Sequence, residues 1–136
     1  QNRFYAQSGY DKEIRAFCKE NSITYESFWS LTANPNILSS EVLQNLAIKY
    51  QRGVAEIFYR FLNHKDIVPL NGTTSLKHMI EDLKIGEFEL TNDEIEEISK
   101  FIKYCIYSNT TVYLEFKYIY INIKLMLIKS FLDFIF

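Results

Sequence analysis

This 136-residue chain contains few cysteines and histidines and has a small net charge, and each of these features excludes a class of protein. The two cysteines, Cys18 and Cys105, are too few and too far apart for a disulfide framework or a zinc site, so we expect no metal and a cytoplasmic location. His64 and His78 lack a cluster of further ligands and are expected at the surface. A net charge of -2 without a basic stripe gives no reason to expect nucleic-acid binding.

The N-terminal residues also lack two features. Gln1 stands where an initiator methionine would, so we expect the chain to be a piece of something longer. Residues 1–20 have no apolar segment of the kind found in a signal peptide. With 48% hydrophobic and 24% charged residues, the composition is that of a globular domain with a real core.

Residues 104–136 differ from the preceding residues. They contain no glycine or proline, and they are rich in aromatic residues, isoleucine, leucine, lysine and asparagine. A membrane-spanning helix needs ~20 mostly apolar residues, and charges interrupt this segment too often for that. We expect no membrane span, leave an interfacial anchor open, and favour a non-native extension such as translated AT-rich DNA. The expected organisation is therefore residues 1–103 as one domain and 104–136 as a tail.

Helical and strand patterns alternate along the first segment. Apolar spacing predicts helices, β-branched and aromatic runs predict strands, and Ser39 and Ser40, Ser75 and the Thr91–Glu94 pair are expected helix caps. The expected elements are a helix over 10–21, a strand over 23–31, a helix with apolar positions from Val42 to Tyr50, a helix over 54–62, a strand over 66–70, a short helix ending at Leu83 and a helix after 91. Strands joined by helices pair in parallel, which predicts an α/β architecture. Two strands do not make a stable covered sheet, so residues before Gln1 are expected to supply others.

The stretch from Val68 to Leu83 carries the clearest chemistry. A strand is followed by the small-residue turn Gly72–Ser75 and then by a short helix. Unpaired N–H groups at a helix start and nearby hydroxyl groups suit a phosphate, although an ordinary capped turn has the same pattern. Phe28 and Trp29 end the preceding strand, where they could stack on a flat ring or belong to the core. Arg15 and the acidic group around Glu94 are expected on solvated helix faces, and no catalytic triad is visible.

These motifs together resemble the last third to half of the aldo-keto reductases. The resemblance covers about residues 1–103, belongs to a subgroup with a Gly-Thr-Thr-Ser turn, and is carried by residues 1–5, 23–34, 69–75, 78–83 and 88–91. It implies an α/β fold that is part of a (β/α)₈ barrel, from the end of strand six to strand eight. It also implies an NADP(H) or NAD(H) cofactor and a small carbonyl substrate that is reduced to an alcohol by hydride transfer.

The resemblance further implies which residues touch the cofactor. Gln1 would meet the nicotinamide carboxamide, Phe28 would stack on the nicotinamide ring, and Ser30 and Leu31 would follow the pyrophosphate. The adenosine end would be bordered by Gly72, Thr73, Thr74, Ser75, His78, Glu81 and Asp82. Much of the family has lysine in place of Gly72 and arginine in place of His78, and their absence weakens the case for NADP(H) over NAD(H).

The family's catalytic Asp, Tyr, Lys and His precede the part of the family that this chain resembles. No residue here is assigned a catalytic role, and we expect the chain to need a missing N-terminal half-barrel for activity. Two alternatives stay open at this point. The chain could be a non-enzymatic relic or interaction protein, or it could associate with membranes through its aromatic tail.

Overall fold

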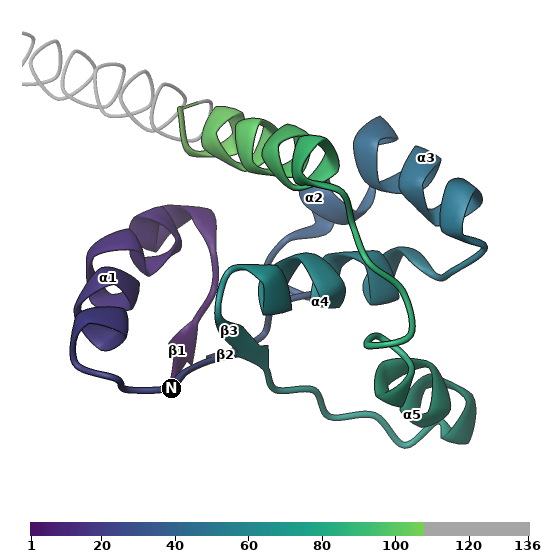
Figure 1. Cartoon of the computed structure of the whole chain (residues 1–136), viewed down its shortest axis with the longest axis horizontal. Helices are drawn as coiled ribbons and strands as arrows, with labels where there is room; N and C mark the ends of the chain where they lie inside the picture. Colours follow the sequence, from purple (N-terminus) through teal and green to yellow (C-terminus); the bar gives the residue numbers. More distant parts are fainter. Residues whose placement is uncertain (108–136) are drawn as a thin grey trace, which may run out of the picture.

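A computed structural model describes residues 1–107, which form an α/β unit around a small parallel sheet (Figure 1). The expectations for residues 108–136 therefore lie outside the described residues. The elements are β1 (Asn2–Arg3), the 3-10 helix η1 (Ala6–Asp11), α1 (Lys12–Glu20), β2 (Tyr25–Phe28), α2 (Pro35–Leu38), α3 (Glu41–Tyr50), α4 (Val54–His64), β3 (Ile67–Pro69) and α5 (Leu76–Leu83). Residues 92–107 are also helical and are called the 92–107 helix below.

The sheet has the order β1–β2–β3, and both pairs of neighbours are parallel. The predicted α/β class is therefore confirmed, as are the two expected strands. Both are shorter than predicted. Strand β2 ends at Phe28 because Trp29 takes a left-handed conformation at φ 58°. The periodicity did not predict β1 or α2, which are too short to show a pattern.

One face of the sheet packs on helices and forms the core. Tyr25 and Ser27 of β2 and Ile67 of β3 are buried on this side. Helix α4 buries Ile57, Phe58, Phe61 and Leu62 in the same cluster, each a side chain whose burial contributes roughly 1.5–3 kcal/mol. On the other face Val68 remains 44% exposed, so residues 1–107 cover only one side of the sheet.

The capping predictions are confirmed in detail. The Ser40 hydroxyl oxygen accepts a hydrogen bond from the Leu43 N–H at the start of α3. The Thr91 hydroxyl oxygen accepts from the Glu94 N–H, and the Glu94 carboxylate accepts from the Thr91 N–H. Each cap satisfies backbone donors that a helix start leaves unpaired, which fixes where these helices begin.

Three expectations about exposure were wrong, the first being that the amphipathic helix predicted over 10–21 buries its apolar face. Helix α1 leaves Ile14 and Phe17 49% and 59% exposed, because no described element covers that side of it. Arg15 is half-buried rather than solvated, since its Nε donates a 2.8 Å hydrogen bond to the Tyr10 carbonyl. His64 is also half-buried, with its Nε2 3.2 Å from the Glu89 carboxylate.

The fourth wrong expectation concerns Glu94, which is buried and joins three segments. Its carboxylate accepts hydrogen bonds from Lys49 at 2.6 Å, from the Tyr50 hydroxyl at 2.7 Å and from the Thr91 N–H at 2.7 Å. Burial raises the pKa of this carboxyl, but the hydrogen bonds outweigh burial and hold the pKa at about 2. The ionised Glu94 thus fastens the start of the 92–107 helix to the end of α3.

Among residues 1–107, no helix combines the length and apolar character that crossing a bilayer requires. The same residues do not bring three or more potential metal-binding side chains together. The 92–107 helix includes residues on both sides of position 103, and the expected division of the chain at that position stays a prediction.

We predict that Glu94→Gln lowers the free energy of unfolding by about 1.5–3 kcal/mol at neutral pH, because three hydrogen bonds lose their charged acceptor. A carboxyl with a depressed pKa stabilises the fold above its unfolded pKa, and this contribution disappears as the pH falls toward the folded pKa of about 2. The difference between the two proteins should therefore shrink between about pH 5 and pH 2. Urea unfolding of the 136-residue chain, monitored by circular dichroism, measures this difference in the free energy of unfolding.

The matched control is Glu97→Gln, on the same helix but exposed. It should change stability by no more than about 0.5 kcal/mol. Equal stability of the two variants at neutral pH would contradict the role given to Glu94.

Candidate functional site

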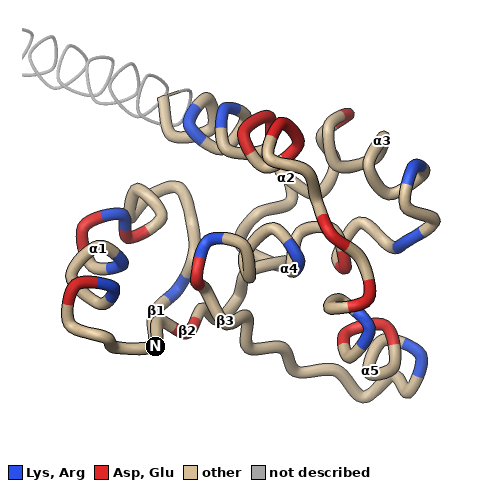
Figure 2. Tube along the Cα trace, in the orientation of Figure 1, with Lys and Arg blue, Asp and Glu red and all other residues tan. Residues whose placement is uncertain are grey.

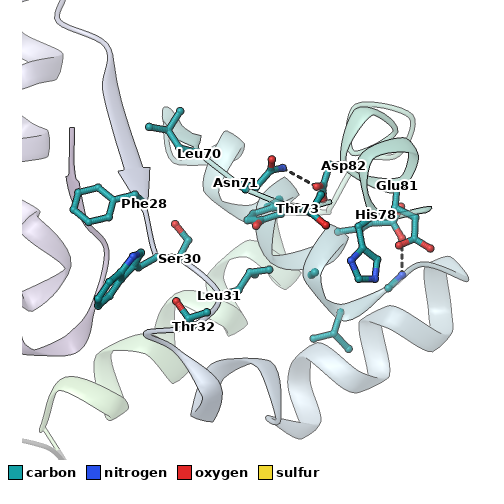
Figure 3. Close-up of a pocket in the computed structure, with 17 residues that line it drawn as sticks. Phe28, Ser30, Leu31, Thr32, Leu70, Asn71, Thr73, His78, Glu81 and Asp82 are labelled. Atoms are coloured by element: carbon teal, nitrogen blue, oxygen red, sulfur yellow. Dashed lines mark hydrogen bonds between the residues drawn. The ribbon is translucent and has the colours of Figure 1, made fainter. Parts of the chain in front are cut away.

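A groove of about 820 Å³ lies at the carboxyl ends of β2 and β3. In α/β sheets this is the edge at which ligands bind, because the loops that follow parallel strands emerge there together. Its lining comes from the end of β2 and the loop after it, the turn after β3, the start of α4, and α5: Phe28, Trp29, Ser30, Leu31, Thr32, Gly53, Val54, Ala55, Glu56, Tyr59, Leu70, Asn71, Gly72, Thr73, His78, Glu81 and Asp82. Figure 3 shows Phe28 on one side of the groove and His78 and Glu81 on the other.

The first wall is the loop after β2, and Asn34 holds it in place. The buried Asn34 amide donates to the Phe4 carbonyl at 2.7 Å and to the Ser30 carbonyl at 2.8 Å. The Ser30 hydroxyl lies 2.9 Å from that of Ser27, in a fully buried pair. These bonds turn the chain back immediately after Phe28, so that Leu31 and Thr32 continue along the groove (Figure 3).

The second wall is the turn between β3 and α5. It leaves the sheet with a 2.7 Å hydrogen bond from the Leu70 N–H to the Ser27 carbonyl. The Asn71 amide then donates to the Asp82 carboxylate at 2.7 Å, which closes the turn onto α5 (Figure 3). Gly72 has a backbone φ outside the left-handed range and open space around the position of a Cβ, so a side chain would fit there without strain.

The start of α4 forms the third wall, and sequence reasoning missed it. Glu56 caps this helix by accepting a 2.7 Å hydrogen bond from the Gly53 N–H, and it lies 3.4 Å from Arg52. The sequence held a signal for the helix start, namely glutamate three residues after Gly53. Nothing in that spacing indicated that the helix would face Phe28, which only the packing of α4 on the sheet decides.

The groove carries more negative than positive charge. Glu56, Glu81 and Asp82 line it, whereas none of the seventeen lining residues is lysine or arginine. The pKa of Asp82 is raised, first by burial and then by Glu81 and Glu56, while His78 and the hydrogen bond from Asn71 act in the opposite direction. Burial, with a smaller effect of Asp82, raises the pKa of Tyr59 to about 12, so this hydroxyl stays protonated at neutral pH.

Eight of the eleven candidate residues line this one groove: Phe28, Ser30, Leu31, Gly72, Thr73, His78, Glu81 and Asp82. Gln1, Thr74 and Ser75 do not line it. Gln1 and Thr74 are exposed, and the Ser75 hydroxyl oxygen accepts instead from the His78 N–H at 3.4 Å. The structure therefore brings most of the candidate residues together and gives Ser75 a capping contact.

The two aromatic residues at the end of β2 differ in environment. Phe28 is half-buried, and its ring meets that of Trp29 edge-on at 6.4 Å. Trp29 is 57% exposed, with the Arg3 guanidinium 4.0 Å from its ring, so the alternative that places Trp29 in the core is wrong. As the only tryptophan of the chain, Trp29 is a natural fluorescent probe of the groove.

We predict that Ser75→Ala destabilises α5 by about 1 kcal/mol, because the helix loses its side-chain cap. Helix α5 has no buried residue, so its opening should be local rather than global. Amide hydrogen exchange at His78 and Met79 should accelerate about fivefold, whereas exchange in α4 should not change. Thr74→Ala is the control, since no side-chain hydrogen bond of Thr74 is present within residues 1–107; equal acceleration by both variants would contradict the cap.

Comparison with known proteins supplies the family context. No protein-family model matches the chain. Aldose reductase C of Dictyostelium discoideum is 26% identical over 88 residues, which are 64% of this chain and 27% of that protein. Glyoxal reductase of Bacillus subtilis is 30% identical over 87 residues, or 64% of this chain and 31% of that protein. The chain thus spans about three tenths of the length of the curated relatives that it matches.

Solved structures agree on the fold. An aldo-keto reductase from Brucella melitensis superposes with a TM-score of 0.62 at 21% identity, over 72% of this chain and 36% of that one. A Bombyx mori aldo-keto reductase in complex with NADP gives a TM-score of 0.61 at 21% identity, over 74% and 34%. The chain is therefore similar in sequence to part of these reductases, and its described residues have the fold of a part of aldo-keto reductase structures.

Proposed function

We propose that residues 1–107 are the cofactor-binding part of an NAD(P)H-dependent aldo-keto reductase barrel, from the end of strand six to strand eight. The observation that carries this proposal is the shared groove. Phe28, from the loop after β2, and Gly72 and Thr73, from the turn after β3, line the same 820 Å³ space. A single elongated ligand could contact both, as a dinucleotide with its ring at one end and its adenosine phosphate at the other would.

The arrangement of side chains suits that orientation. Phe28 offers a half-buried aromatic face for a nicotinamide ring, and Ser30 and Leu31 lie between it and the turn (Figure 3). Gly72 and Thr73 line the other end of the groove, where Glu81 and Asp82 would border the adenosine. The family resemblance is the only support for the proposed cofactor contacts of Gln1, Thr74 and Ser75.

Charge decides how tightly a phosphate would be held. A 2′-phosphate near Gly72 and His78 would meet no lysine or arginine from the groove lining and would lie near three carboxylates. A missing charge-assisted hydrogen bond costs about 1.5–3 kcal/mol. We therefore propose that binding relies on backbone and hydroxyl donors, and that the preference for NADP(H) over NAD(H) is weak.

The nicotinamide would supply the hydride that converts a small carbonyl substrate to an alcohol. Residues 1–107 would bind and orient it, and the resemblance gives none of them the role of protonating the carbonyl oxygen. The Tyr25 hydroxyl donates to the buried Asp11 carboxylate at 2.7 Å, and Tyr25 lies at the other end of β2 from Phe28. We propose that the chain alone is inactive and needs a complementary half-barrel.

A second function is favoured by one observation. The sheet face that bears Val68 has no cover within residues 1–107, which suits a protein that binds a partner through this face without catalysis. A measurement of dinucleotide binding distinguishes the two functions, since a protein that only binds a partner has no need to retain a dinucleotide site.

We predict that Gly72→Lys tightens NADPH binding about tenfold or more, because an ammonium group is added beside the expected 2′-phosphate. The affinity for NADH should change much less, since it lacks this phosphate. Quenching of Trp29 fluorescence by added cofactor measures both dissociation constants on the 136-residue chain.

The matched control is Gly86→Lys, which adds the same charge at an open position outside the groove lining. It should leave both affinities unchanged. Equal tightening by the two variants, or equal effects on NADPH and NADH, would count against the proposed site of the 2′-phosphate.

We also predict that the 136-residue chain, mixed with NADPH and a simple aldehyde, oxidises no more NADPH than a blank without protein. The reason is that the resemblance assigns the family's catalytic Asp, Tyr, Lys and His to no residue of positions 1–107. A complete aldo-keto reductase in the same assay is the positive control. Turnover that survives purification of the chain to homogeneity would contradict the proposed inactivity.

A further inference from the structure

A second groove lies at the opposite end of the sheet from the proposed cofactor site. It has a volume of about 470 Å³ and separates α1 from the turn that joins α4 to β3. Ile23 and Tyr25, at the amino end of β2, form its floor. Because Tyr25 points to the helical side of the sheet, this groove does not depend on whatever covers the other face.

The lining of this groove is strongly basic. Lys12, Arg15, Lys19 and Lys65 line it together with a single carboxylate, that of Asp66. Asp66 is already paired with Lys19 at 2.8 Å, and this pair is exposed at the rim. Figure 2 shows basic and acidic segments along α1, and a basic and an acidic segment between α4 and β3. A chain with a net charge of -2 thus concentrates positive charge at one place.

Arg15 is held rigidly inside the groove. Its Nε donates to the Tyr10 carbonyl at 2.8 Å, and its guanidinium carbon lies 5.7 Å from the centre of the Phe4 ring. Within residues 1–107 no carboxylate forms an ion pair with Arg15, and no acceptor bonds its two Nη groups. Burial lowers the pKa of Arg15, while Tyr25 and Asp11 act in the opposite direction. An oriented, half-buried guanidinium with free donors is suited to receive an oxyanion in a bidentate contact.

Lys65 adds repulsion between like charges. Its pKa is lowered first by burial and then by Arg15 and Lys103, with a smaller opposing effect of Glu96. Its ammonium group lies 5.7 Å from the centre of the Phe61 ring and forms no ion pair among the described residues. Two half-buried cations that repel each other cost free energy, and a bound anion would offset that cost.

We propose that this groove binds a doubly charged phosphate group, either inorganic phosphate or the phosphate of a small phosphomonoester. Arg15 would grip two oxygens through its Nη groups, and Lys65 and Lys12 would supply point charges. The space exceeds what a phosphate ion fills, so a small organic group can accompany it. The phosphates of a dinucleotide in the first groove cannot be this ligand, since the two grooves lie at opposite ends of β2 and β3.

The test is a titration of the ¹⁵N-labelled 136-residue chain, followed by NMR, with inorganic phosphate and with glycerol 3-phosphate at low salt. The amide resonances of α1, Lys65 and Asp66 should shift as either phosphate is added. Glycerol, and sodium chloride at equal ionic strength, are the controls and should shift none of these resonances. Tighter binding of glycerol 3-phosphate would identify a phosphomonoester as the ligand, and equal binding would identify the phosphate group alone.

Arg15→Gln and Lys65→Gln should each weaken binding about tenfold or more, and Arg15→Lys should weaken it less than Arg15→Gln does. Lys77→Gln, an exposed cation on α5 outside this groove, is the matched control and should bind as the natural chain does. Lys65→Gln keeps the test valid if Arg15→Gln fails to fold. Absence of saturable shifts, shifts reproduced by chloride, or unchanged affinity in Lys65→Gln would overturn the proposal.

Discussion

The parallel pairing of β2 with β3 is the constraint on which both grooves depend. Its register matches Tyr25 with Ile67 and Ser27 with Pro69, and the hydrogen bond from Leu70 to Ser27 extends the pairing past the last strand residue. Both strands consequently end at one level, and their loops leave the sheet side by side. A slip of one residue would exchange the buried Tyr25 and Ser27 for Glu26 and Phe28, and it would lose the core together with the groove.

The two ends of the sheet differ in charge, although the chain as a whole is nearly neutral. The carboxyl end collects Glu56, Glu81 and Asp82 without a lysine or arginine in the lining, whereas the amino end collects Arg15 and Lys65 with their neighbours. An anionic ligand at the carboxyl end must therefore rely on backbone N–H groups and hydroxyls, and the same ligand at the amino end meets unpaired cations. If the two proposals hold, the first site would select its ligand by shape and the second by charge.

Buried polar side chains hold the irregular segments that shape the site. Asn34 fixes the loop after β2 by bonding two carbonyls, and Glu94 fixes the start of the 92–107 helix by accepting from Lys49, Tyr50 and Thr91. Helix α5, by contrast, has no buried residue and is held by its cap and by the contact of Asn71 with Asp82. The part of the proposed cofactor site that would meet the adenosine thus lies on an element without buried residues, which is common for segments that adapt to a ligand.

The sequence by itself determined the alternation of elements and most helix starts, because capping at Ser40, Ser75 and Thr91 and the apolar spacing of α3 and α4 are local properties. Its resemblance to the aldo-keto reductases also picked out eight residues that share one groove. Only the tertiary structure decided that α4 supplies the third wall, that Glu94 is buried, and that Arg15 and Lys65 face each other across a second groove. Those facts depend on contacts between residues far apart in the chain. Packing, rather than spacing along the sequence, decides which side chains are buried and which charges repel each other.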